Sequence, residues 1–145
     1  MQITKSDWIL LILRKQPLDR IHIMKSLFLI ERNAKKKIQG YFQFEPYLYG
    51  PCSLDVYSEL RNLLAHGFIV QPPQPMQAWA NYYLTEQGCI KAKEISEKIN
   101  SENINLIDKT VDEIKNLGFF ELLKKVYSEA PEFTTNSVLK EVIKQ

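Results

Sequence analysis

Few side chains in this sequence could ligate a metal or attack a substrate. The soft ligands and nucleophiles with that capacity are His22, Cys52, His66 and Cys89. Structural zinc sites use closely spaced pairs, such as two cysteines separated by two residues, and these positions match no such pattern. No Gly-rich phosphate loop, HExxH or G-x-S-x-G motif is present. We therefore expect no metal, no cofactor and no enzymatic activity.

Cys52 is the one cysteine with a chemical argument. It precedes Ser53, which is a good N-cap for the helix expected to follow. The dipole and the free N–H groups of a helix N-terminus lower the pKa of a nearby thiol and favour the thiolate. This position predicts a redox-sensitive residue. The alternative is an inert, small hydrophobic side chain, which is what most free cysteines are.

Positive charge gathers in the first third of the chain. Residues 1–40 contain nine Lys and Arg against three Asp and Glu, whereas residues 41–90 contain one against four. Clustered positive charge is what neutralises nucleic-acid phosphates. The residues expected to contact phosphates are Arg20, Lys25, Arg32, Lys35, Lys36 and Lys37. For the Lys35–Lys37 run, the alternative is a solvated loop.

The first two expected helices carry most of this charge. Thr4 and Asp7 have the spacing of a capping box, and the helix they open should end before Pro17. A second helix is predicted to start near Asp19, with apolar residues three or four apart along one face. A loop with a turn at Gly40 follows.

The middle of the chain is aromatic and then helical. Residues 41–49 are predicted to be extended and irregular, because Pro46 removes a hydrogen-bond donor that a strand would need. Gly50-Pro51 is predicted to form a turn. Residues 53–66 are predicted to form a third helix that ends at Gly67.

A hairpin and further helices complete the pattern. Residues 68–70 and 79–84 are β-prone and should pair across a long Pro-rich tip, and Thr85 should cap the next helix. Later helices are predicted after Ser101, over 119–127 and over 135–143. The apolar stripe on the helix after Ser101 needs a partner, either within the chain or from a second subunit, and the second option predicts a homodimer.

This order predicts a mainly α fold with a small β-hairpin: a winged helix-turn-helix domain over residues 1–99 and a helical extension, a candidate dimerisation element, over 100–145. The length of 145 residues and the 45% hydrophobic content suit a compact globular chain. The aliphatic run 9–13 is far too short to span a membrane. Two cysteines without a disulfide pattern suit a reducing compartment, so we expect a soluble cytoplasmic protein.

Several short motifs support this fold by resemblance. Tyr49-Gly-Pro-Cys-Ser53, Tyr57-Ser-Glu-Leu60 and the segment 64–69 resemble the signature of YwgA-like proteins and of the related Panacea (SocA-like antitoxin) domains. Residues 24–29 resemble the "QK-x-L-F-L" helix of the same proteins. Residues 83–88 look like the wing-to-helix junction of MarR- and PadR-type regulators. The resemblance implies a winged helix.

The winged-helix order favours a transcriptional regulator that binds double-stranded DNA. The third helix would enter the groove, with Ser53 at its start and Arg61 and Asn62 facing the bases, while Trp79 could stack or wedge from the wing. The charges agree only in part. Asp55 and Glu59 lie on the same helix, and the tip of the wing carries no charge.

The alternative function is a protein-interaction module, either antitoxin-like or an adaptor, with little or no DNA binding. Trp79 and the aromatic stretch 41–49 are of the residue types enriched at interface centres. The resemblance to antitoxin domains implies that a toxin or chaperone could be bound. Against this, Phe42, Phe44 and Tyr47 could simply be core residues, with Trp79 packed on the hairpin.

Overall fold

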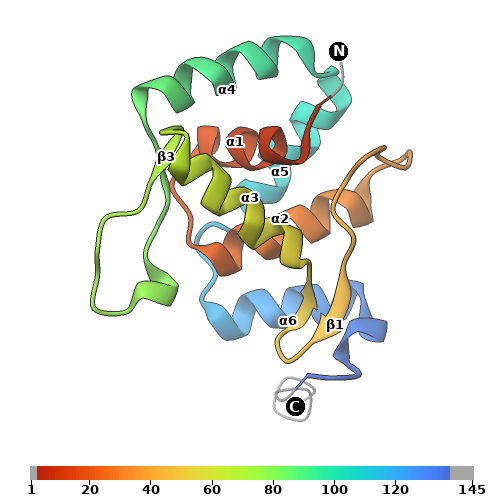
Figure 1. Cartoon of the computed structure of the whole chain (residues 1–145). Coiled ribbons are helices and arrows are strands. Elements are labelled where there is room, and N and C mark those ends of the chain that lie inside the picture. Colours follow the sequence, from red (N-terminus) through yellow and green to blue (C-terminus); the bar gives the residue numbers. More distant parts are fainter. Residues whose placement is uncertain (1–2, 138–145) are drawn as a thin grey trace.

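The computed structural model describes residues 3–137 and is mainly helical (Figure 1). The helices are α1 (Lys5–Lys15), α2 (Arg20–Asn33), α3 (Leu54–Ala65), α4 (Glu86–Lys98), α5 (Ser101–Ile114) and α6 (Phe119–Glu129), with the 3-10 turns η1 (Gln77–Trp79) and η2 (Pro131–Thr134). The antiparallel hairpins are β1 (Glu45–Tyr47) with β2 (Gly50–Cys52), and β3 (Ile69–Val70) with β4 (Tyr83–Leu84). The predicted fold class, mainly α with a small β-hairpin, is confirmed. The helix predicted over 135–143 falls largely outside the described residues.

Side-chain caps start the helices where the sequence predicts. At α1 the Asp7 amide donates to Thr4 Oγ1 at 3.3 Å, and the Thr4 amide donates to Asp7 Oδ2 at 3.0 Å. The Asp19 carboxylate caps α2 by accepting from the His22 amide at 2.9 Å, and Thr85 caps α4. Such caps are worth about 1 kcal/mol each. Ser53 occupies the N-cap position of α3 but forms no side-chain cap hydrogen bond.

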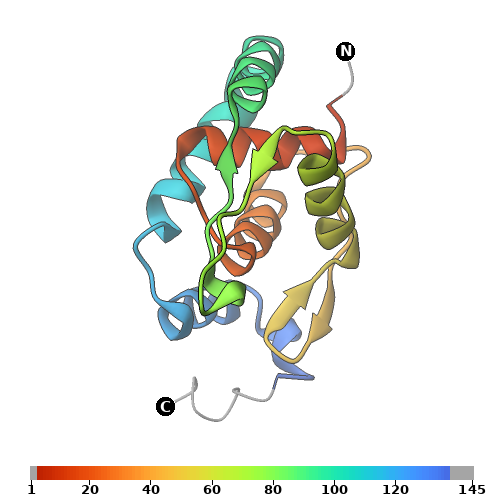
Figure 2. The ribbon, with the colours of Figure 1, turned by 60° about the vertical axis from the view of Figure 1, so that its left-hand side comes forward.

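The core lies around α1, whose residues 7–13 are all buried. Helix α4 packs along one side of α1, and α5 packs against both α1 and α2 (Figure 2). On α5 the side chains of Ile107, Val111 and Ile114 are completely buried in the same cluster as the α1 and α2 side chains. The apolar stripe of α5 therefore has its partner within the chain.

The predicted wing is the β3–β4 hairpin. Ile69 pairs with Leu84 and Val70 with Tyr83, and an isolated bridge from Leu18 to Tyr82 adds the α1–α2 connection as a third segment. The paired part is shorter than the predicted β-prone runs. The long loop between the strands folds back toward α2 and α6 instead of projecting freely, and η1 lies within it (Figure 2).

The prediction for residues 41–51 was wrong in two respects. Residues 45–52 form a regular hairpin, and its turn lies at Leu48 and Tyr49, whereas Gly50-Pro51 belongs to β2. The prolines are tolerated because Pro46 and Pro51 face each other. In an antiparallel ladder every second facing pair exchanges no hydrogen bonds, so a pair of prolines can occupy it without losing a donor.

None of the helices within residues 3–137 has the length and apolar character that crossing a bilayer requires.

Candidate interaction site

Three distant chain segments bring aromatic rings together at the surface. Phe119, the first residue of α6, lies between Tyr49 of the β1–β2 turn and Trp79 of η1, with ring centroids 5.4 Å away in each case. Phe120 contacts the same ring edge-on, also at 5.4 Å. Edge-to-face pairs are a favourable arrangement of aromatic rings.

These rings remain open to solvent. Phe120 is 55% exposed, Tyr49 44% and Trp79 37%. Leu48 of the same turn and Tyr47 at the end of β1 are also exposed. We define the aromatic surface as Tyr47, Leu48, Tyr49, Trp79, Phe119 and Phe120. It contains no charged side chain. Single exposed apolar residues are common, but a group that clusters in this way is typical of an interaction site.

The structure decides which aromatic residues belong to the core. Phe42 is buried and Phe44 half-buried, as the core interpretation expected, but Tyr47 is exposed. Trp79 packs on Phe119 of α6. Phe119 and Phe120 were not predicted as site residues from the sequence. Two adjacent large aromatic residues at a helix start were the available signal, because neighbouring positions point in different directions and an amphipathic helix buries only one side.

His22 fixes the turn that carries Phe119. Its Nδ1 lies 2.9 Å from Asp19 Oδ2, and its Nε2 lies 2.7 Å from the Leu117 carbonyl oxygen. Both partners can only accept, so the protonated imidazolium satisfies both by donating from each nitrogen. Burial lowers the pKa of His22, but the hydrogen bonds to Asp19 and Leu117 and the Asp19 charge outweigh it, so the pKa lies above 6.5. We call these two hydrogen bonds of the His22 ring the His22 latch, and the latch joins α2 to the α5–α6 turn.

We expect this latch to make stability depend on pH. Because the folded state raises the pKa of His22, its contribution is complete below pH 6.5 and is lost as the pH rises through the folded pKa. Urea unfolding at about pH 6 and about pH 8.5 should show a loss of about 1 kcal/mol in the wild type beyond that in His22→Gln, where this titration is absent. Equal losses in both proteins would contradict the latch.

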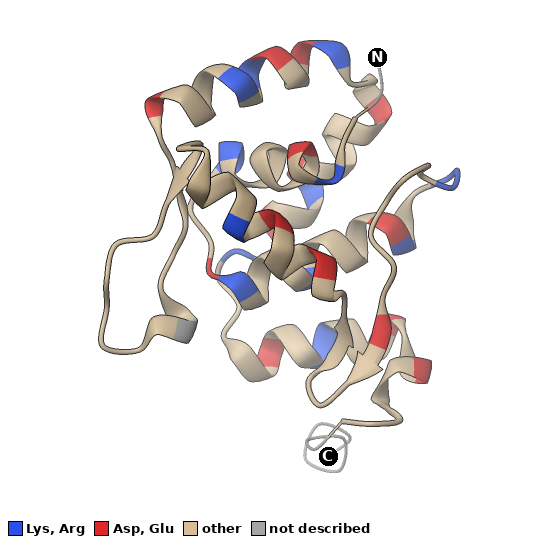
Figure 3. Ribbon diagram, viewed as in Figure 1, with Lys and Arg blue, Asp and Glu red and all other residues tan. Residues whose placement is uncertain are grey.

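Three of the six predicted phosphate-binding cations are buried or paired with a carboxylate. Lys25 and Ser53 are buried, which removes both from the surface. Arg32 pairs with Glu132 at 2.6 Å, and Lys35 with Glu102 at 3.4 Å. Lys36 and Lys37 are exposed, but Figure 3 places their loop at the opposite end of the molecule from the wing. The structure therefore does not gather the six predicted cations, Arg20, Lys25, Arg32 and Lys35–Lys37, into one basic surface.

Two predicted residues do meet. Arg20 and Arg61 line one pocket of about 410 Å³ between α3 and the wing, together with Tyr57 and Tyr82. Neither arginine forms an ion pair with a residue of the described chain. Asn62 is exposed on the next position of α3. The two tyrosines were not predicted as site residues, because only the fold brings them beside the arginines.

The acidic residues of α3 are held by α1. Asp55 accepts from Lys5 Nζ at 2.8 Å, and Glu59 accepts from the Ser6 hydroxyl. These contacts tie the start of α3 to the start of α1. In the N-terminal half of α3 the exposed side chains are therefore Leu54 and Asp55.

The prediction of a lowered thiol pKa at Cys52 was wrong. Cys52 is half-buried in β2, and this burial raises its pKa despite the opposing effects of the Lys25 charge and a hydrogen bond with Tyr57. Desolvation of the thiolate outweighs the helix terminus that the sequence argument relied on. The structure gives no support to the redox interpretation.

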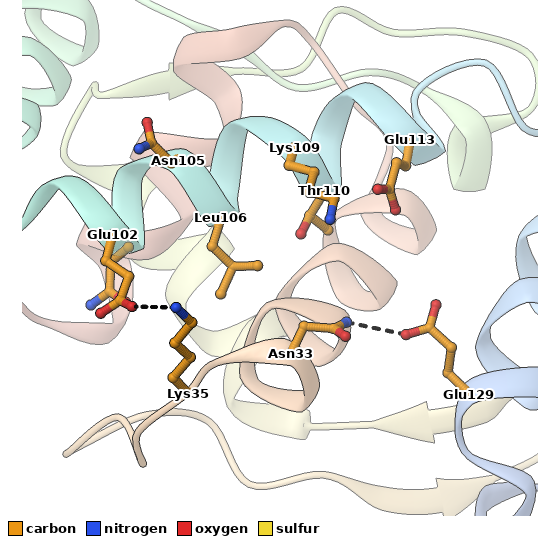
Figure 4. A pocket seen from close by; sticks show the side chains of 10 residues that line it. Asn33, Lys35, Glu102, Asn105, Leu106, Lys109, Thr110, Glu113 and Glu129 are labelled. Carbon is orange, nitrogen blue, oxygen red and sulfur yellow. Dashed lines mark hydrogen bonds and ion pairs between the residues drawn. The ribbon is translucent and has the colours of Figure 1, made fainter.

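A polar groove of about 420 Å³ runs between the end of α2, α5 and α6 (Figure 4). Within it, Lys35 forms an ion pair with Glu102 at 3.4 Å, and Asn33 donates to Glu129 at 3.1 Å. These contacts connect the end of α2 with α5 and α6. Within residues 3–137, no group of three or more His, Cys, Asp or Glu side chains could hold a metal ion.

No protein-family model matches this sequence, and no curated protein or solved structure matches it significantly.

Proposed function

We propose that this chain is a winged-helix protein-interaction module that binds a partner polypeptide through the aromatic surface. One observation carries the proposal: Tyr49 and Trp79 converge on Phe119 from separate segments and leave Phe120 exposed beside them. Exposed aromatic side chains supply much of the binding energy at the centre of protein interfaces. The partner would insert apolar side chains among the rings, because this surface offers no charge to pair with a charged segment.

The charges around α3 favour a protein partner over DNA. A recognition helix reads bases mainly with its N-terminal residues. In α3 this half exposes Leu54 and Asp55, and Asp55 is already paired with Lys5, so these two positions offer no cation to the phosphate backbone. The wing adds no charge, and its Trp79 is packed against Phe119 instead of standing free to enter a groove.

A matched pair of variants tests the proposal. Phe120 and Ile90 are each 55% exposed, and Ile90 lies on α4, away from the aromatic surface. Tagged wild type, Phe120→Ser and Ile90→Ser are used to capture proteins from the native host, and the affinity of each purified partner is then measured. We expect Phe120→Ser to weaken binding by roughly thirtyfold, as truncation of an interface hot spot does, and Ile90→Ser to leave it unchanged.

Two results would count against this function. One is a partner that binds Phe120→Ser as tightly as it binds the wild type. The other is that no partner shows a difference between Phe120→Ser and Ile90→Ser. Urea unfolding of both variants serves as a control, since exposed substitutions should change stability by no more than about 0.5 kcal/mol.

DNA binding is the second candidate, and the arginine pocket specifically favours it. Arg20 and Arg61 are two unpaired guanidinium groups beside α3 and the wing, and guanidinium is well suited to phosphate. The wild type is titrated with duplex DNA at about 50 mM salt, where phosphate contacts are strongest. Binding that the double variant Arg20→Glu, Arg61→Glu abolishes would support this function, and no binding by the wild type would eliminate it.

A further inference from the structure

Lys25 is a buried cation without an acidic partner. Its side chain is 4% exposed, and its ammonium donates to the Pro51 carbonyl oxygen at 2.9 Å. No carboxylate of the described chain forms an ion pair with it. Lysine is rarely buried unless it is paired, because an ammonium has three donors and loses its hydration in the interior. One carbonyl oxygen is a small replacement for that hydration.

Lys25 also lines an apolar pocket. The pocket has a volume of about 190 Å³ and lies between α2 and the β1–β2 hairpin. Besides Lys25, the residues that determine its character are Ile21, Met24, Tyr47, Leu48, Cys52 and Tyr57. A cavity of this size is smaller than the usual site for a drug-sized molecule and suits a body of one ring or one short branched chain.

The positive charge of Lys25 is not balanced by a negative charge among the residues that line the pocket. Burial lowers the pKa of Lys25 to about 8, so the ammonium is still mostly protonated at neutral pH. The other titratable residues that line the pocket are Tyr47, Tyr49, Cys52 and Tyr57, and no carboxylate is among them. Two of these groups are partly buried, the Cys52 thiol and the Tyr57 hydroxyl, and burial raises the pKa of both. Both groups are therefore neutral at pH 7, and neither supplies the missing negative charge.

We propose that this pocket binds a small monocarboxylate with an apolar body, such as an aromatic or branched-chain carboxylic acid. The carboxylate would pair with Lys25 Nζ, and the apolar body would lie against Met24, Tyr47 and Leu48. A charge-assisted hydrogen bond at low dielectric favours the anion strongly over a neutral isostere. This pocket borders the arginine pocket at Tyr57 and the aromatic surface at Tyr47 and Leu48, but the proposal does not depend on a protein or DNA partner.

Isothermal titration with benzoate, phenylacetate and isovalerate at about pH 7 tests the proposal, with benzamide as the neutral match for benzoate. At least one of the acids should bind the wild type, and benzoate should bind roughly tenfold to a hundredfold more tightly than benzamide. Lys25→Met should abolish this preference. The variant should fold, because an apolar side chain replaces an unpaired buried charge. Lys37→Met, at an exposed lysine, should behave like the wild type.

The pH dependence gives a second readout. A carboxylate stabilises the protonated lysine, so binding should weaken as the pH rises above about 8, where the free protein loses this proton. The proposal is overturned if none of the three acids binds at about 10 mM. It is equally overturned if benzoate and benzamide bind alike, or if Lys25→Met keeps the preference for the acid.

Discussion

Replacing Gly88 with alanine is expected to destabilise the protein by about 3 kcal/mol or more, although alanine is the better helix former. Gly88 lies in the first turn of α4, directly against the wing. A Cβ atom at this position would lie 2.0 Å from the Phe68 carbonyl oxygen and 3.2 Å from Leu84 Cδ2. The Phe68 oxygen also accepts from the Thr85 amide at 3.0 Å, so it cannot move without breaking the strand-to-helix junction.

Urea unfolding of Gly88→Ala measures this loss, and Gly118→Ala provides a control. At Gly118 an added Cβ atom would meet only the Glu121 carboxylate, at an ordinary 3.5 Å, so its cost should stay below about 1 kcal/mol. If Gly88→Ala were as stable as the wild type, the close approach of α4 to the wing would be wrong. The glycine that ends the wing-to-helix motif thus has a steric reason to be there.

The second large effect is expected at Ile107 of α5. Its side chain is fully buried with those of α1 and α2, so Ile107→Ala should cost about 2–5 kcal/mol through lost burial and the cavity left behind. Ile90→Ala, at an exposed position, should stay within about 0.5 kcal/mol of the wild type. Chemical unfolding of both variants makes the comparison. A loss at Ile107 no larger than that at Ile90 would mean that α5 is not part of the core on which α1 and α2 depend.

The sequence was informative wherever the determinants are local. The caps at Thr4, Asp19 and Thr85 lie within three residues of the amides they accept from. Thr4 and Thr85 were predicted as caps, and Asp19 was predicted to lie near the start of its helix. Helical periodicity and the Pro-rich loop between two β-prone runs also located α3 and the wing. The β1–β2 hairpin was missed because its stability depends on Pro46 facing Pro51, and the pattern of a single strand does not show this pairing.

The candidate site depended on contacts between distant residues. The sequence pointed to Trp79 and to the stretch that contains Tyr49. The residue that contacts both is Phe119, which starts a helix forty residues after Trp79. Whether a cation is exposed, paired or buried also depends on tertiary contacts. Arg32 meets Glu132 across most of the chain, and Lys25 is buried by the hairpin that was not predicted. Composition alone cannot distinguish a free cation from an engaged one.

Quenching of tryptophan fluorescence by acrylamide tests the central claim, that the aromatic surface is where a partner binds. The chain contains two tryptophans, and Trp8 is only 2% exposed whereas Trp79 is 37% exposed, so quenching reports mainly on Trp79. A tryptophan-free segment of the captured partner is added at saturation. We expect quenching to fall toward that of a fully buried indole. Quenching that stays at the level of the free protein, while the partner is bound, would contradict the claim.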